Sequence, residues 1–153
     1  MTDQKMIGFT VPGKVKGQPR PRITTVGGHP RAYDPQDAVD YKSWVRMRCI
    51  DAMRISHNTD PCPMAGTGYQ LEIVAHVPVP SSWSKKRTAA ALRGEVEPRV
   101  KPDADNIAKI IMDAINGILW RDDKDVTSLM VSKVYSEKET VCVTVSWKEE
   151  KDV

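Results

Sequence analysis

The sequence predicts a single small domain of the α/β (α+β) class, and its size and local patterns support this. The chain has 153 residues, of which 40% are hydrophobic and 28% are charged, as expected for one globular unit with one core. Some segments alternate apolar and polar residues or are rich in β-branched residues, which predicts strands. Others place apolar residues three and four apart, which predicts helices. We therefore expect residues 1–153 to form one domain, with a frayed tail at 149–153.

The N-terminal half is predicted to contain one strand, one long loop and one helix. Residues 5–11 have strand-like composition and stop at a Pro-Gly pair. Residues 14–35 are rich in Gly, Pro and Arg and predict a long basic loop, a kind of segment that is usually functional or disordered. Residues 36–55 show the helical spacing of apolar side chains, and 56–68 form a connection rich in helix breakers.

The C-terminal half is predicted to contain three further strands and two helices. Residues 69–80 alternate as a half-buried strand does, and a short helix follows at 82–92, closed by Gly94. Residues 126–136 and 140–147 are β-rich and are separated by only three charged residues. We therefore expect these two strands to pair as a terminal hairpin.

The second of these helices lies within KPDADNIAKIIMDAINGILWRDD, residues 101–123. At about 100° per residue its isoleucines fall on one side, and its polar side chains fall on the other. We expect Asp103 and Asp105 to be presented by an extended segment, because alternate side chains of extended chain point the same way. Asp105 would then be the N-cap of a helix that starts at Asn106, with Lys109 one turn later over Asp105.

Charge is distributed unevenly along a chain whose formal net charge is only +3. Residues 14–31 carry five basic residues and no acid, and 84–101 carry six basic residues against two glutamates. Residues 103–125 contain six aspartates. An acidic segment next to basic segments suits a metal-dependent enzyme that acts on a polyanion, since carboxylates hold the cation while Lys and Arg hold phosphates. Composition alone favours an ordinary solvated surface with charges of both signs over such a site.

The end of the 101–123 segment decides whether a metal site is complete. Asn116-Gly117 terminates the helix, and the turn that follows could return Asp122 or Asp123 towards it. Three carboxylates and a lysine that converge on one point would suit Mg²⁺ or Mn²⁺, which prefer oxygen ligands. Taken separately, a DxD is more often a cap or a solvated loop, and a DD pair is more often a turn.

The same segment resembles the signature of the RusA family of Holliday junction resolvases, D-x-D-N-x-x-K-x-x-x-D-A-x-N-G followed by D-D and a hydrophobic strand. GQPRPR and HPRAYDP, between residues 17 and 35, are similar to the basic loop and helix start of bacteriophage and prophage members. SSWSKKRTAAALRG, before KPD, resembles the longer members of the family. Together these motifs cover most of the chain.

The resemblance implies a mixed β-sheet flanked by helices, and a symmetric homodimer that acts on four-way DNA junctions with Mg²⁺, for which Mn²⁺ is a plausible substitute. Carried over by position, the metal-binding acids are Asp103, Asp105 and Asp123, with Asp122 as an alternative ligand, and the essential lysine is Lys109. These four principal residues are the expected catalytic set. Asp113 and Asn106 also match recurrent positions without an assigned role, and Asp113 is placed to orient Lys109.

The expected function is therefore a Mg²⁺-dependent endodeoxyribonuclease that resolves Holliday junctions by paired symmetric hydrolysis of phosphodiesters, in DNA recombination and repair. Two alternatives remain open: a broader structure-selective nuclease on branched phage DNA, and a module that binds branched DNA without cutting it. The residues expected to contact DNA are lysines and arginines of the two basic segments, 14–31 and 84–101. They are Lys14, Lys16, Arg20, Arg22, Arg31, Lys85, Lys86 and Arg87.

Other features place the protein in a cellular context. No apolar run approaches the roughly 18 to 20 residues that cross a bilayer, and the first residues lack the pattern of a secretory signal. The three cysteines fit neither a disulfide framework nor a zinc pattern. We expect a soluble, cytoplasmic protein with no membrane partner.

Overall fold

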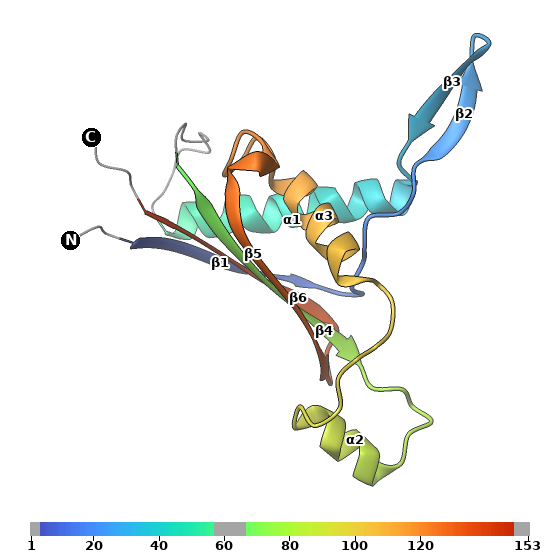
Figure 1. Ribbon diagram of the computed structural model, residues 1–153, viewed down its shortest axis with the longest axis vertical. Coiled ribbons are helices and arrows are strands. Elements are labelled where there is room, and N and C mark those ends of the chain that lie inside the picture. The colour runs from blue at the N-terminus through green and yellow to red at the C-terminus, as the bar shows by residue number, and fades with distance from the viewer. Residues whose placement is uncertain (1–3, 57–66, 149–153) are drawn as a thin grey trace.

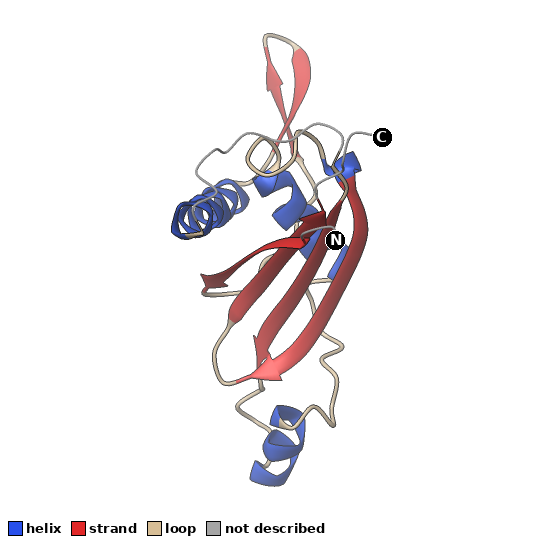
Figure 2. Cartoon of the chain, turned by 90° about the vertical axis from the view of Figure 1, so that its left-hand side faces the viewer, coloured by secondary structure: helices blue, strands red, loops and turns tan. Residues whose placement is uncertain are grey.

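The structure, a computed structural model, describes residues 4–56 and 67–148. Its centre is a four-stranded mixed β-sheet (Figure 2). Across the sheet the strands are β1 (Gln4–Pro12), β6 (Thr140–Lys148), β4 (Tyr69–Pro78) and β5 (Val126–Ser136). β6 is antiparallel to both of its neighbours, whereas β4 and β5 are parallel. The expected α+β domain with a mixed sheet is therefore confirmed.

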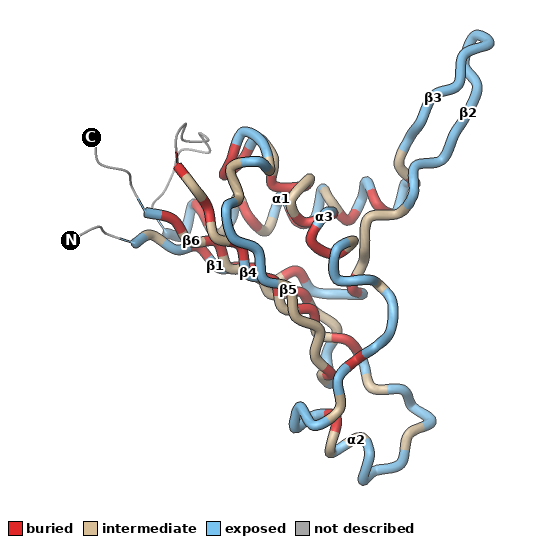
Figure 3. The backbone as a smooth tube through the Cα atoms, in the orientation of Figure 1, coloured by how far each residue is buried: buried red, intermediate tan, exposed pale blue. Residues whose placement is uncertain are grey.

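One face of the sheet is covered by two helices, α1 (Gln36–Ile55) and α3 (Ala104–Ile115), which pack side by side (Figures 1 and 2). The strands turn their apolar residues towards this layer: alternate residues of β4 from Tyr69 to Val77 are buried, as are alternate residues of β6 from Val141 to Trp147. Figure 3 shows the buried positions concentrated between sheet and helices. The alternation in the sequence predicted β4, because burial on one face requires a period of two, whereas the β-rich composition predicted β6.

The predicted hairpin of the last two strands is wrong, because β4 lies between β5 and β6. β4 pairs with β6 from Tyr69 to His76 and with β5 over its whole length. A strand with fully buried alternate residues is best accommodated inside a sheet, where both of its edges find hydrogen-bond partners. The three-residue connection from β5 to β6 therefore passes the end of β4 instead of forming a hairpin turn.

The predicted loop at 14–35 is wrong in part, because it contains a two-stranded hairpin, β2 (Arg22–Val26) and β3 (His29–Tyr33). Gly27 and Gly28 form its turn with φ angles of 59° and 80°. Positive φ at both central residues is the requirement of a type I′ hairpin turn, which glycine meets at no steric cost. The run of β-branched residues before Gly-Gly was the sequence signal for it. The hairpin projects from the body, and all its strand residues are exposed (Figures 1 and 3).

The short predicted helix is confirmed as α2 (Lys85–Leu92), which begins three residues later than the predicted start. Ser84 is its N-cap, and the Ser84 hydroxyl accepts a hydrogen bond from the backbone of Arg87 at 3.2 Å. Gly94, with φ of 82°, follows the C-cap residue as expected. α2 lies at the opposite end of the molecule from the β2–β3 hairpin (Figure 1).

Two predicted segments fall largely outside the described residues. They are the connection at 56–68, of which 57–66 are not described, and the tail at 149–153. Within the described part of the chain, no helix combines the length and apolar character needed to cross a membrane.

Candidate functional site

The polar face of α3 is presented by the burial of its opposite face. Ile107, Ile110, Ile111 and Ile115 are fully buried against α1 and the sheet, as the sequence predicted. Each buried isoleucine stabilises the folded state by about 1.5–3 kcal/mol, so the rotation of the helix about its axis is strongly fixed. The side of α3 that carries Lys109 is consequently turned to solvent.

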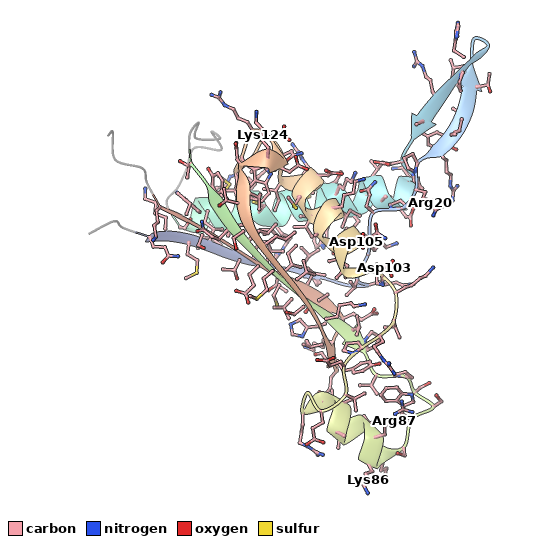
Figure 4. The ribbon with its side chains drawn as sticks, in the orientation of Figure 1. Arg20, Lys86, Arg87, Asp103, Asp105 and Lys124 are labelled. Atoms are coloured by element: carbon pink, nitrogen blue, oxygen red, sulfur yellow. The ribbon has the colours of Figure 1, made fainter. Side chains whose placement is uncertain are left out.

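α3 begins two residues earlier than predicted. Asp103, not Asp105, is the N-cap residue: it is extended, with φ of −66° and ψ of 146°, and its backbone carbonyl accepts from the amide of Ile107 at 3.1 Å. Asp105 is already helical, and its carboxylate accepts from the amide of Asn106 at 3.0 Å. The two aspartates are therefore not alternate residues of one extended segment. Both are nevertheless exposed at the N-terminal end of α3 (Figure 4).

Asp122 and Asp123 lie towards the other end of the helix. Asp123 opens a short 3₁₀ helix, η1 (Asp123–Asp125), and Figure 4 shows the next residue, Lys124, far from Asp103 and Asp105. The hydrogen bond with Asp122 is the main reason why the pKa of the Asp123 carboxyl is raised; desolvation and the negative charges of Asp122 and Asp113 add to it. The same hydrogen bond lowers the pKa of Asp122. Asp123 thus returns towards Asp113, in the last turn of α3.

The predicted metal ligands do not form one cluster. Among residues 4–56 and 67–148, no three Asp, Glu, His or Cys side chains come close enough to hold one metal ion. The helix explains this, because eight residues from Asp105 to Asp113 span about 12 Å at 1.5 Å per residue. Mg²⁺ is commonly held by one or two carboxylates, with water and substrate phosphate completing its shell. The exposed carboxylates at either end of α3 suit that mode of binding.

Lys109 and Asp113 do not form the pair that the sequence suggested. Lys109 is exposed and makes no ion pair with Asp105 or Asp113 in the described structure. Asp113 instead lies 3.8 Å from the ammonium of Lys42 on α1, which is also 3.0 Å from Asp34. The sequence reasoning missed Lys42 and Asp34, because nothing local indicates that they meet α3.

The C-terminal end of α3 is tied to the body by hydrogen bonds. The guanidinium of Arg46 on α1 donates to the carbonyl oxygens of Ala114 and Asn116 at 3.0 and 3.3 Å. The buried indole of Trp120 donates to the side-chain oxygen of Asn116 at 2.7 Å. The chain from α3 to Asp123 therefore leaves the helix along a fixed path.

A pocket of about 510 Å³ adjoins the N-terminal end of α3. Its lining includes Asp103 and Asn106 from this end, together with Lys14 and Lys101. A carboxylate beside two ammonium groups can take part in holding a phosphate and a cation next to each other.

The expected DNA-contacting residues have different surroundings. Lys16 lies 3.3 Å from Asp37, and its hydrogen bond lowers the pKa of that carboxyl. Arg87 stacks over the ring of Trp83 at 3.7 Å from its centroid. The rest of the set is exposed, and the described structure shows no ion pair for it. These residues are Lys14, Arg20, Arg22, Arg31, Lys85 and Lys86.

Several of these basic residues lie on two projections on either side of α3: Arg22 and Arg31 on the β2–β3 hairpin, and Lys85, Lys86 and Arg87 on α2. Figure 4 shows Arg20 at the base of the β2–β3 hairpin, Lys86 and Arg87 on α2, and Asp103 and Asp105 between them. In the sequence, the acidic segment follows both basic segments. In the fold, the acids at the N-terminal end of α3 lie between the basic residues of the hairpin and those of α2.

Comparison with known proteins identifies the family of this chain. Residues 12–146 match the family described as Endodeoxyribonuclease RusA. The chain is also similar to a protein of Bacillus subtilis (strain 168) described as uncharacterized protein YqaN. The two are 32% identical over 139 residues, which cover 91% of this chain and 94% of that protein. The chain therefore belongs to the RusA family of endodeoxyribonucleases.

Proposed function

We propose that the protein is a Mg²⁺-dependent endodeoxyribonuclease that resolves four-way DNA junctions by paired symmetric cuts, in DNA recombination and repair. The observation that carries the proposal is the exposed face of α3, which presents Asp103, Asp105 and Lys109 to solvent between two basic projections. In a chain of an endodeoxyribonuclease family, a DNA phosphate on this surface would meet both acids and cations.

The candidate residues would have two chemical roles, metal binding and charge stabilisation. Asp103 and Asp105 would hold Mg²⁺, or Mn²⁺ in its place, and Asp123 would contribute from the other end of α3, with Asp122 as an alternative ligand. When bound, such an ion makes a coordinated water more acidic and neutralises charge on the phosphate. Lys109 would stabilise the negative charge that grows on the phosphate oxygens as the phosphodiester bond breaks.

Two further elements complete the proposal. The exposed basic residues of the hairpin and α2 would hold the DNA arms through their phosphates, which positions the substrate without reading its sequence. A symmetric homodimer would supply two active sites related by a two-fold axis, which matches the symmetry of paired nicks in a four-way junction. Light scattering of the protein in solution tests the dimer, and a monomer bound to an intact junction would contradict it.

The test of function incubates the protein with a labelled four-way junction, a Y-fork and a linear duplex of the same sequence. Each reaction contains Mg²⁺, Mn²⁺ or EDTA. We expect symmetric, ligatable nicks in the junction with either metal and no cutting in EDTA. Equal cutting of all three substrates would instead indicate a broader structure-selective nuclease. Binding without cutting under every metal condition would indicate a non-catalytic branched-DNA module.

A further inference from the structure

The β2–β3 hairpin has two chemically different faces. In an antiparallel pair, residues directly opposite each other lie on the same face, and faces alternate along each strand. The register places Arg22 opposite Tyr33, Thr24 opposite Arg31, and Val26 opposite His29. These six residues share one face, which we call the basic face. The remaining pairs, Ile23 with Ala32 and Thr25 with Pro30, form a neutral face.

No other part of the described chain covers either face of the hairpin. Every strand residue is exposed, and Ile23 and Val26 retain 75% and 51% of their accessible surface. A two-stranded hairpin alone is at best marginally stable in water. An arm of this kind gains order when a surface of suitable chemistry binds it, and two arginines, a histidine and a tyrosine on one face suit a polyanion with stacked bases.

The base of the hairpin is fixed to the candidate catalytic helix. The side-chain amide of Gln18, before β2, donates to Asp34, after β3, at 3.1 Å, so the two strands are joined at their root. The backbone amide of Gln18 donates to the carbonyl of Asn106 on α3 at 2.9 Å. Gly17 lies so close to α3 that an added Cβ would be 2.9 Å from the Cβ of Asn106. The direction of the arm is thereby set relative to Asp103 and Asp105.

We propose that the hairpin is a β-ribbon that enters a groove of duplex DNA with its basic face towards the DNA. This inference rests on the proposed action on DNA and adds how the substrate is held. The major groove of B-form DNA is wide enough for a two-stranded ribbon, and two-stranded ribbons are a known means of groove recognition. With its root on α3, the ribbon would hold one DNA arm at a set position beside the acids.

Adjacent threonines on opposite faces provide a matched test. Thr24→Glu places a carboxylate on the basic face, opposite Arg31, whereas Thr25→Glu places the same charge on the neutral face, opposite Pro30. Binding of a fluorescein-labelled four-way junction and of linear duplex is measured by anisotropy in EDTA, at about 0.15 M salt, where screening acts over about 8 Å. Thermal unfolding followed by circular dichroism serves as the control that both variants fold.

We expect Thr24→Glu to weaken binding by about tenfold or more, because a like charge at a DNA contact is repelled, and Thr25→Glu to change it by less than about threefold. Equal weakening by both variants, a larger effect of Thr25→Glu, or no effect of either would overturn the inference. These outcomes require wild-type protein that binds DNA, and they do not depend on cleavage. Wild-type protein that binds DNA but never cuts would contradict the proposed function alone, and wild-type protein that binds no DNA would contradict both.

The salt dependence gives a second measurement. Arg31→Ala should lower the slope of log affinity against log salt by about 0.9, the value for one phosphate contact. The control is Arg54→Ala, which removes an exposed arginine from the far end of α1. An unchanged slope for Arg31→Ala, or an equal change for both variants, would contradict a DNA contact by the basic face.

Discussion

Carboxylates lie at both ends of α3, but in the described structure only those at the C-terminal end include one in an ion pair with a basic side chain. At the C-terminal end, Asp113 lies 3.8 Å from Lys42, and Asp122 and Asp123 share a hydrogen bond. At the N-terminal end, Asp103 and Asp105 are exposed, and the described structure shows no ion pair for either. Asp103 borders a pocket, whereas Asp113 is part of a partly buried network with Lys42 and Asp34.

This difference distinguishes aspartates that stabilise the fold from aspartates that are free to bind a metal ion. A carboxylate that is held by a lysine contributes to packing between helices, and its lone pairs are partly used. A carboxylate that only a backbone amide or solvent contacts keeps acceptor capacity for a cation. We therefore expect the N-terminal pair, together with Asp123, to act in cleavage, and the Lys42 network to act on stability.

The largest expected effect tests whether both ends serve one reaction. Asp103→Asn and Asp123→Asn should each lower junction cleavage by at least about 1,000-fold, because metal ions contribute several kcal/mol to charge stabilisation and loss of a carboxylate weakens their binding. Junction binding should persist, since removing negative charge does not weaken phosphate contacts. Cleavage rates and anisotropy measure the two properties.

The control for these variants is Asp51→Asn, which removes an exposed carboxylate from α1 and should leave cleavage unchanged. Wild-type rates for Asp123→Asn would separate the two ends of α3 and remove Asp123 from the site. Wild-type rates for Asp103→Asn would overturn the assignment at the N-terminal end.

The next effect concerns the exposed lysine between the two ends. Lys109→Ala should lower the cleavage rate by about 100-fold, the cost of losing one donor that stabilises transition-state charge, with little change in binding. Lys109→Arg should recover part of the rate because the positive charge is kept. Lys138→Ala, at another exposed lysine, is the control. Equal loss of binding and rate would make Lys109 a general phosphate contact.

A smaller effect is expected for the network at the C-terminal end. Lys42→Met should destabilise the fold by about 1.5–3 kcal/mol, since Asp34 and Asp113 lose a charged hydrogen-bond and ion-pair partner. Thermal unfolding measures this, and Lys138→Met serves as the exposed control. An unchanged melting temperature would show that the network is only a surface contact.

The smallest effect concerns pH and the raised pKa of Asp123. A carboxyl whose pKa is raised by folding is disfavoured in its ionised form, so its contribution to stability is present below about pH 3.8 and is lost as pH rises through the folded pKa. At pH 7 in EDTA, Asp123→Asn should therefore unfold at a slightly higher temperature than wild type. Differential scanning calorimetry should show this difference shrinking as the pH approaches 3.8, and a constant difference would exclude the charge of Asp123 as its cause.

Much of the local structure followed from the sequence. The apolar spacing in α3 predicted which face is buried, and the alternation in β4 predicted its strand. Strand pairing did not follow, because the short link between β5 and β6 suggests a hairpin, whereas the actual neighbour of both is β4. The β2–β3 hairpin was missed because proline, glycine and arginine around it indicated a loop, although Gly27-Gly28 is a hairpin turn signal.

The sequence by itself determined which side of α3 is buried and which faces solvent, since helical periodicity and the burial of isoleucine are properties of a short segment. Only the tertiary structure decided that Asp123 returns to Asp113, and that Lys42 and Asp34 join that end of the helix. These contacts join residues far apart in the chain, and they depend on how α1 and α3 pack together on one face of the sheet. Local sequence patterns do not predict such packing, because it depends on the complementary surfaces of elements that meet only in the folded protein.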